Sequence, residues 1–121
     1  MNKYSKDELI EFEKLLTRRR DTRITEIENY IRQISELSEN GKDENGIENS
    51  GYEVQFNYLF SHKERAMKNL KDIENALLRI TNNRYGICVV TNKLISKKRL
   101  LAVPTTTKSI EGKQMLENEK P

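Results

Sequence analysis

The sequence predicts a mainly α protein: a long antiparallel two-helix coiled-coil hairpin, followed by a small C-terminal module with a short last helix. Two segments carry apolar residues at helical spacing, and a glycine-rich stretch separates them. The 121 residues include only two Pro and five Gly, which disfavour helix interiors. Charged residues make up 34% of the chain, which is too polar for a sheet-rich enzyme core. We expect the hairpin over residues 1–83, with its tip at 41–51, and the module over 84–121.

The first helix is predicted to begin next to Ser5. Ser5 and Glu8 have the spacing of a capping box, in which each residue bonds the other's backbone N–H group. Tyr4 and Leu9 stand where a hydrophobic staple closes over such a cap. Both features indicate a helix start.

An apolar stripe then predicts that this helix continues to about Asn40, with Gly41 as its stop. Arg20 occupies a stripe position, so we expect the packing to loosen there. The stripe comprises Leu9, Phe12, Leu16, Ile24, Ile27, Ile31 and Ile34, and its isoleucines alternate steps of three and four.

Residues 41–51 hold three of the five glycines and predict a turn. Asn45 with Glu48 and Ser50 with Glu53 both have capping-box spacing, which leaves the start of the second helix open by a few residues. Two apolar series then repeat every seven residues, as in a coiled coil. They are Leu59, Ala66, Ile73 and Ile80, and Phe56, Lys63, Leu70 and Leu77, in which Lys63 alone breaks the apolar pattern. A short turn between two such helices makes them antiparallel.

The pattern changes after the second helix. Residues 84–104 hold β-branched residues and turn formers without a helical period, so we expect short strands and loops. After Pro104 a last short helix is predicted, with Thr107 or Ser109 as its cap.

Charge is unevenly distributed along the chain. The formal net charge is +3, but residues 41–51 carry a net −2 and residues 84–121 a net +5. No apolar run approaches the length of a membrane span, and a single Cys fits a reducing compartment. We therefore expect a cytoplasmic protein without a membrane anchor.

Residues 76–113 carry a resemblance to a known family. They are similar to the C-terminal half of the DksA/TraR family of bacterial transcription regulators. The matching elements are Leu77, Ile80, Tyr85-Gly86-x-Cys88, Ile95, Arg99-Leu100, Ala102 and Pro104-Thr105. The resemblance implies a coiled-coil hairpin on a small zinc-finger module with a trailing helix.

The zinc ligands of that family are largely missing here. The family pattern of two Cys-x-x-Cys pairs falls on Cys88, Thr91, Ser109 and Gly112, so one ligand of four remains. Hydroxyl groups are poor zinc ligands and Gly has no side chain. We therefore expect no cofactor and no structural zinc, and a zinc-finger-like module that apolar packing holds together.

The resemblance also implies a partner and a mechanism without catalysis by the protein. Family members bind RNA polymerase, insert the hairpin into its secondary channel and modulate initiation through an acidic tip. The tip motif falls on Asn45, Glu48 and Ser50, and Asp43 and Glu44 stand next to it. We expect these five residues near the polymerase active site.

Some members bind guanosine tetraphosphate with basic residues at the polymerase rim. The corresponding positions here are Asp72, Val103 and Lys113, of which only Lys113 is basic. Asp72 would repel phosphate. We expect weak or absent dependence on this alarmone, with Arg99 and Lys113 as candidate contacts to polymerase or alarmone.

Two other functions are compatible with the residues. A nucleic-acid-binding module would use the basic stretch 84–113, although that stretch has one aromatic residue, Tyr85. A structural coiled-coil adaptor would need only the hairpin. His62 and Cys88 have no partners for a nucleophile–base pair, so no enzyme is expected. We further expect a monomer without sequence-specific DNA binding.

Overall fold

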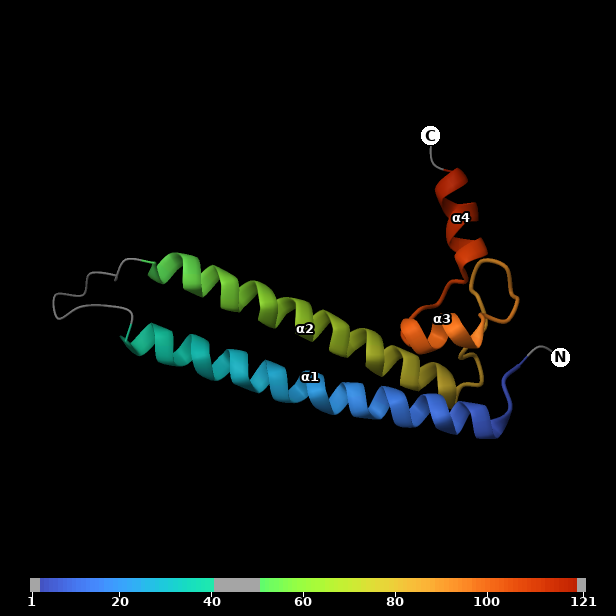
Figure 1. The fold of residues 1–121 in the computed structure, drawn as a ribbon, viewed down its shortest axis with the longest axis horizontal. Helices are drawn as coiled ribbons and strands as arrows, with labels where there is room; N and C mark the ends of the chain where they lie inside the picture. The colour runs from blue at the N-terminus through green and yellow to red at the C-terminus, as the bar shows by residue number, and fades with distance from the viewer. Residues whose placement is uncertain (1–2, 41–50, 120–121) are drawn as a thin grey trace. The chain divides into compact units, whose positions relative to one another are not determined.

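The computed structural model describes residues 3–40 and 51–119. These ranges contain four helices (Figure 1): α1 (Lys6–Asn40), α2 (Tyr52–Thr81), α3 (Lys97–Ala102) and α4 (Ile110–Asn118). The expected end of the first helix at Asn40 is confirmed, and α2 begins at Tyr52, at the end of the predicted turn. Gly41, the predicted stop, lies outside the described residues.

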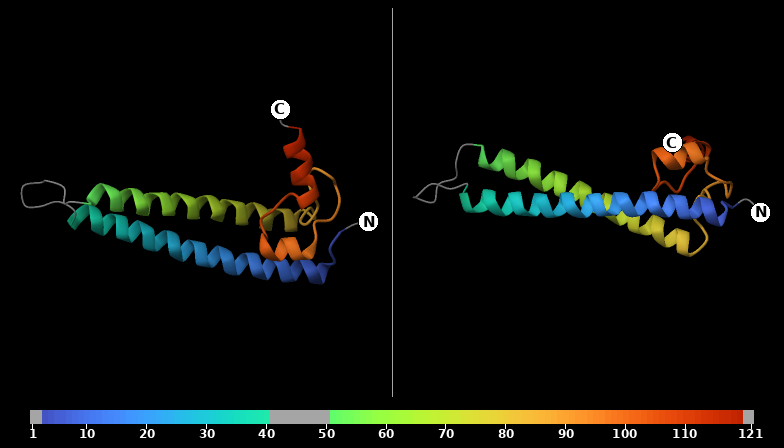
Figure 2. Two further views of the ribbon diagram at one scale, coloured as in Figure 1. Left: turned by 45° about the horizontal axis from the view of Figure 1, so that its top comes forward. Right: turned by 60° about the horizontal axis from the view of Figure 1, so that its bottom comes forward.

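The chain forms two compact units. Unit 1 comprises Met1–Arg19 and Asp72–Pro121, and unit 2 comprises Arg20–Lys71. Within each unit a segment of α1 packs antiparallel against a segment of α2 (Figure 2). The mainly α fold class with two long antiparallel helices is confirmed. The division expected at residues 83 and 84 stays a prediction.

The predicted cap at the start of α1 is present. The backbone N–H of Ser5 donates to Glu8 Oε1 over 3.1 Å, and the backbone N–H of Glu8 donates to Ser5 Oγ over 3.2 Å. These bonds lower the pKa of the Glu8 carboxyl, because they favour its charged form. Tyr4 and Leu9, the two residues of the predicted staple, both pack against the core of unit 1.

Unit 1 has an apolar core that joins the two long helices to the C-terminal module. Phe12 lies at its centre and contacts two aromatic rings, with centroids 5.3 Å away in both cases: Tyr4 edge-on and Tyr85 tilted. Buried residues of this core come from α1, α2, the turns after α2, and α3. They are Phe12, Leu16, Ile73, Ala76, Ile80, Tyr85, Cys88, Ile95 and Leu100.

The seam of unit 2 differs from the predicted stripe on α1. Ile27 and Ile34 are half-buried as expected, whereas Ile24 and Ile31 are exposed. Arg23 and Tyr30 take the adjoining seam positions instead, where Arg23 Nε donates to Asn69 Oδ1 over 2.7 Å and Tyr30 stacks on His62. The spacing of the four isoleucines does not reveal that Ile24 and Ile31 lie beside the seam and not within it.

The strands expected over residues 84–104 are wrong. The described residues of this segment contain one isolated antiparallel bridge, between Ile87 and Leu94, and the helix α3. Ser96 caps α3 by accepting from the Arg99 backbone N–H, so a local cap outweighs the β-branched composition nearby. The last helix is confirmed as α4, with Ser109 as its N-cap.

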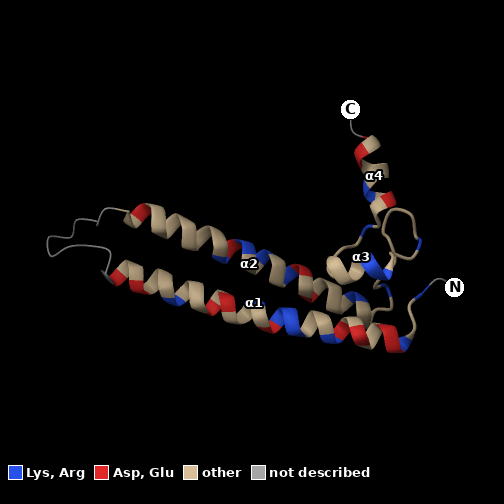
Figure 3. Cartoon of the chain, viewed as in Figure 1, with Lys and Arg blue, Asp and Glu red and all other residues tan. Residues whose placement is uncertain are grey.

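None of the helices in the described ranges combines the length and the apolarity needed to cross a bilayer. Acidic and basic residues are interspersed along α1 and along α2 from Lys63 onward, and Lys and Arg gather at the start of α3 (Figure 3).

Candidate functional site

The predicted tip cannot be placed on the structure. Its five residues lie outside the described residues, and their roles stay predictions: Asp43, Glu44, Asn45, Glu48 and Ser50. The site that the structure does build is in unit 1, around the four positions that match the family's zinc ligands.

Hydrogen bonds link all four of these positions. Cys88 Sγ is fully buried and accepts from the backbone N–H of Thr91 over 3.4 Å and from that of Ser109 over 3.4 Å. Ser109 Oγ lies 3.5 Å from the same sulfur and also accepts from the Gly112 backbone N–H over 3.0 Å. The four positions therefore lie together in the structure, with the Cys88 sulfur at their centre.

Gly112 provides the space for this sulfur. A Cβ atom at residue 112 would stand 2.7 Å from Cys88 Sγ and 3.2 Å from Val90 Cβ. Real Cβ atoms do not approach a side chain so closely, so the thiol occupies the volume that a side chain at residue 112 would need.

The hydrogen bonds change the acidity of the thiol. Burial raises the pKa of Cys88, but the donors from Ser109 and Thr91 together outweigh burial and lower the pKa from 9.0 to about 6. The three N–H and O–H donors from Thr91 and Ser109 thus favour the charged form of the thiol.

These residues do not fit a structural zinc ion. Zinc needs four Cys, His or carboxylate ligands in a tetrahedron, and Cys88 is the one such ligand among the four positions. Ser109 Oγ and Cys88 Sγ already take part in hydrogen bonds with one another and with neighbouring backbone N–H groups. No cluster of three or more His, Cys, Asp or Glu side chains exists within residues 3–40 and 51–119 that could hold a metal instead.

Tyr4, Tyr85 and Gly86 attach this module to α1. Tyr85 Oη donates to the Pro104 carbonyl over 2.7 Å, and Tyr4 Oη donates to the Ile95 carbonyl. Burial raises the pKa of Tyr85 to about 12. Gly86 has φ +83°, and a Cβ there would stand 2.6 Å from the Tyr4 ring. Tyr85 and Gly86 were visible in the family motif, whereas nothing in the sequence linked Tyr4 to the module.

Arg99 serves the internal structure of the module. Its Nε donates to the Lys108 carbonyl over 2.8 Å, and one terminal nitrogen donates to Thr106 Oγ1 over 3.5 Å. A contact with polymerase or alarmone stays a prediction. Lys113 on α4, Asp72 on α2 and Val103, which follows α3, are all exposed.

Comparison with known proteins identifies the fold. No family model matches the chain. A solved structure of transcription factor DksA2 from Pseudomonas aeruginosa superposes with a TM-score of 0.85 at 29% sequence identity, covering 94% of this chain and 86% of that one. The chain has a DksA/TraR-family fold. The resemblance seen in residues 76–113 therefore extends to nearly the whole chain.

Two further similarities are partial. A segment of 40 residues is 50% identical to the uncharacterized protein YteA of Bacillus subtilis, and it covers 33% of this chain and 17% of that protein. The structure of the RNA polymerase binding protein and transcriptional regulator Dks from Chlamydia trachomatis gives a TM-score of 0.47 at 20% identity, over 95% of this chain and 93% of that one. This TM-score is too low to support the assignment of the fold.

Proposed function

We propose that this protein is a bacterial RNA-polymerase-binding transcription regulator that acts in the cytoplasm without catalysis of its own. The observation that supports this proposal is the similarity to the DksA2 transcription factor over 94% of the chain. In the proposed mechanism the predicted tip, residues 41–51, enters the secondary channel of polymerase and modulates initiation.

In this proposal the protein needs no structural zinc and depends little on guanosine tetraphosphate. The module needs no zinc, because Cys88 is the single zinc-type ligand at the four corresponding positions and its sulfur is already hydrogen-bonded. Guanosine tetraphosphate contributes little, because an exposed carboxylate at Asp72 and an apolar side chain at Val103 stand where basic residues would be needed.

The decisive experiment is co-purification with bacterial RNA polymerase, followed by crosslinking from residues 45 and 48. We expect crosslinks close to the catalytic Mg²⁺ of polymerase, and none there from a matched probe at Lys98, which belongs to α3. Absence of co-purification would remove the proposal. Retention on DNA without polymerase, weakening steeply with salt, would favour a nucleic-acid-binding module.

Deleting residues 42–49 distinguishes a channel regulator from a structural adaptor. A channel regulator without its tip keeps its affinity for polymerase but loses its effect on transcription in vitro. An adaptor keeps its activity, because the tip has no part in it.

A further inference from the structure

The buried hydrophobic residues are distributed unequally between the two units. Among residues 3–40 and 51–119, ten hydrophobic residues are buried, and nine of them belong to unit 1. The tenth is Ala66 of unit 2, which is 7% exposed and contributes only a methyl group. The described part of unit 2 therefore has almost no fully desolvated core.

The large apolar side chains of unit 2 remain in contact with water in the folded protein. The more protected ones, such as Ile27, Ile34 and Leu59, are only half-buried. Others are largely exposed, among them Ile31 at 53% and Val54 at 73%. The hydrophobic contribution to stability is proportional to the apolar area that folding removes from water. Opening unit 2 is therefore less unfavourable per residue than opening unit 1.

Polar groups take part in the seam of unit 2. Arg23 Nε donates to Asn69 Oδ1 over 2.7 Å, and the rings of Tyr30 and His62 stack with centroids 5.9 Å apart. A polar residue at a seam position specifies the register of a coiled coil but lowers its stability. The seam of unit 2 thus selects one pairing of the two helices without holding them together strongly.

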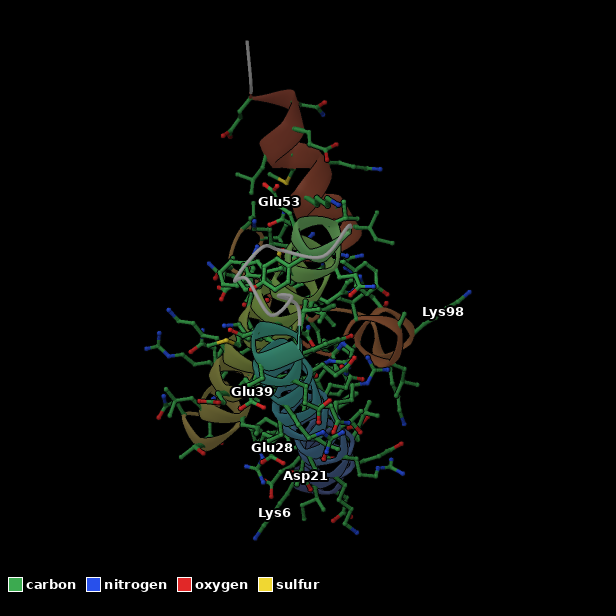
Figure 4. The ribbon with its side chains drawn as sticks, turned by 90° about the vertical axis from the view of Figure 1, so that its left-hand side faces the viewer. Lys6, Asp21, Glu28, Glu39, Glu53 and Lys98 are labelled. Carbon is green, nitrogen blue, oxygen red and sulfur yellow. The ribbon has the colours of Figure 1, made fainter. Side chains whose placement is uncertain are left out.

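Four ion pairs of unit 2 connect neighbours on the same helix. They are Arg20–Asp21, Arg23–Glu26, Arg32–Glu36 and Lys63–Glu64. Pairs of this kind can persist when the two helices separate, and exposed pairs add little to stability in any case. Figure 4, viewed along the helices, shows Asp21 and Glu28 pointing outward from α1. These charges therefore do not oppose the opening of the seam.

Unit 1 is held together by contacts that do not involve unit 2. Phe12 packs against Tyr4 and Tyr85, and Tyr85 Oη donates to the Pro104 carbonyl. All four residues belong to unit 1, so these contacts can remain while residues 20–71 open. The opened segment would form a loop between two parts of unit 1, and the entropy lost in closing a loop grows only slowly with its length.

The boundary between the units coincides with a charged position on the apolar stripe. Unit 2 begins at Arg20, which occupies a stripe position of α1, and it ends at Lys71, two residues before the buried Ile73. A charged side chain interrupts the run of apolar contacts along the seam. Cooperative opening is expected to stop where such contacts are interrupted.

We propose that unit 2 is a labile arm, whose two helical segments separate by local unfolding while unit 1 stays folded. Unit 1 is the stable base of the protein, and the ordering of the arm is a step separate from the folding of that base. Any partner that binds the closed arm shifts this local equilibrium. The inference concerns the free protein, so it does not depend on the proposed function.

Amide hydrogen exchange of the full chain, followed by NMR, tests the proposal. We expect the protection factors of residues 24–36 and 56–68 to be at least about tenfold lower than those of residues 73–79. Within unit 2 they should be similar to one another, with a step at the boundary between the units. Equal protection in the two units overturns the proposal, and so does a gradual decline through unit 2.

Ile80→Val is the discriminating variant, because Ile80 belongs to the core of unit 1. It weakens unit 1 without changing the opening of the arm. Exchange should therefore accelerate about fivefold in residues 73–79 and stay unchanged in residues 56–68. Acceleration by the same factor in both segments overturns the proposal, because the arm would then open only together with the whole chain. Ile95→Val, in the same core, replaces this variant if Ile80→Val does not fold.

Ile27→Val is the matched control in unit 2, where Ile27 is half-buried. We expect it to accelerate exchange about twofold in both segments, because complete unfolding includes the opening of the arm. Unchanged exchange of residues 56–68 in this variant would overturn the proposal, since the seam contacts of the arm would then not control its opening.

Discussion

The Cys88 sulfur stands 2.7 Å from the place where a Cβ atom at Gly112 would be. The two residues occupy family zinc-ligand positions, and here the missing side chain of one makes room for the thiol of the other. The cluster is thus a packed, hydrogen-bonded unit, and the effect of a substitution at one position on stability depends on the side chains at the others.

The variant Gly112→Ala tests this dependence. Alanine is the better helix former by about 1 kcal/mol, so propensity alone predicts stabilisation. The contacts with Cys88 Sγ at 2.7 Å and Val90 Cβ at 3.2 Å predict the opposite sign. Overpacking of this kind costs about 1–3 kcal/mol, so we expect a net loss of about 1 kcal/mol in the free energy of unfolding. Urea titration followed by circular dichroism measures it.

The control for this prediction is a double-mutant cycle with Cys88→Ala. Removing the sulfur removes the closest clash, so the two substitutions together should cost less than their sum. Additive losses, or a Gly112→Ala protein as stable as the wild type, would contradict the packing argument.

The lowered pKa of Cys88 predicts pH-dependent stability. The thiol has a pKa of 9.0 when unperturbed and about 6 in the folded protein. Because the folded pKa is the lower one, the unfolded state binds more protons between these values, and stability rises with pH. The contribution of the Cys88 thiol to the free energy of unfolding is complete above about pH 9 and is lost as the pH falls to about 6. The upper limit of this contribution is about 4 kcal/mol, because each tenfold change in acidity corresponds to about 1.4 kcal/mol.

Cys88→Ser provides the comparison, because a serine hydroxyl does not titrate in this range. We expect the difference in unfolding free energy between wild type and variant to grow from pH 6 to pH 9. A difference that stays constant over this range would mean that folding leaves the pKa of the Cys88 thiol unchanged.

Chelation tests whether packing alone holds the module. We expect the helical signal and the thermal midpoint to be unchanged after prolonged treatment with a strong zinc chelator. The physical reason is that Tyr4, Phe12 and Tyr85 form a contiguous aromatic cluster between α1 and the module, and none of these side chains is a zinc ligand. Loss of helicity together with release of one equivalent of zinc would refute this expectation.

The sequence was sufficient to predict the long helices but not the details of their seam. Capping residues and seven-residue repeats are local signals, so Ser5 caps the first helix and Asn40 ends it as expected. Of the two candidate caps of the last helix, Thr107 and Ser109, the structure uses Ser109. The placement of Ile31 beside the seam depends on how α1 rotates against α2. That rotation is set by partners such as His62, which lie far away in the sequence.

The candidate site was predictable in part for a similar reason. The four positions were located by the resemblance to the family's zinc-ligand pattern, and hydrogen bonds link them in the structure. Their hydrogen bonding around a single sulfur was not foreseen, because it depends on backbone N–H groups whose directions only the fold determines. Helix α3 was missed because a six-residue helix carries too few residues for a period to be read.

The hydroxyl group of Tyr85 stabilises the C-terminal module through a buried hydrogen bond. Tyr85 Oη donates to the Pro104 carbonyl over 2.7 Å in a buried contact. In Tyr85→Phe the ring and its packing on Phe12 stay, but the carbonyl loses its donor. An unsatisfied buried acceptor costs about 1–3 kcal/mol, and we expect a loss of about that size in urea unfolding. Tyr58→Phe is the control, because Tyr58 is 61% exposed and its change should stay within about 0.5 kcal/mol. Equal stabilities of the two variants would show that the bond to Pro104 does not hold the module.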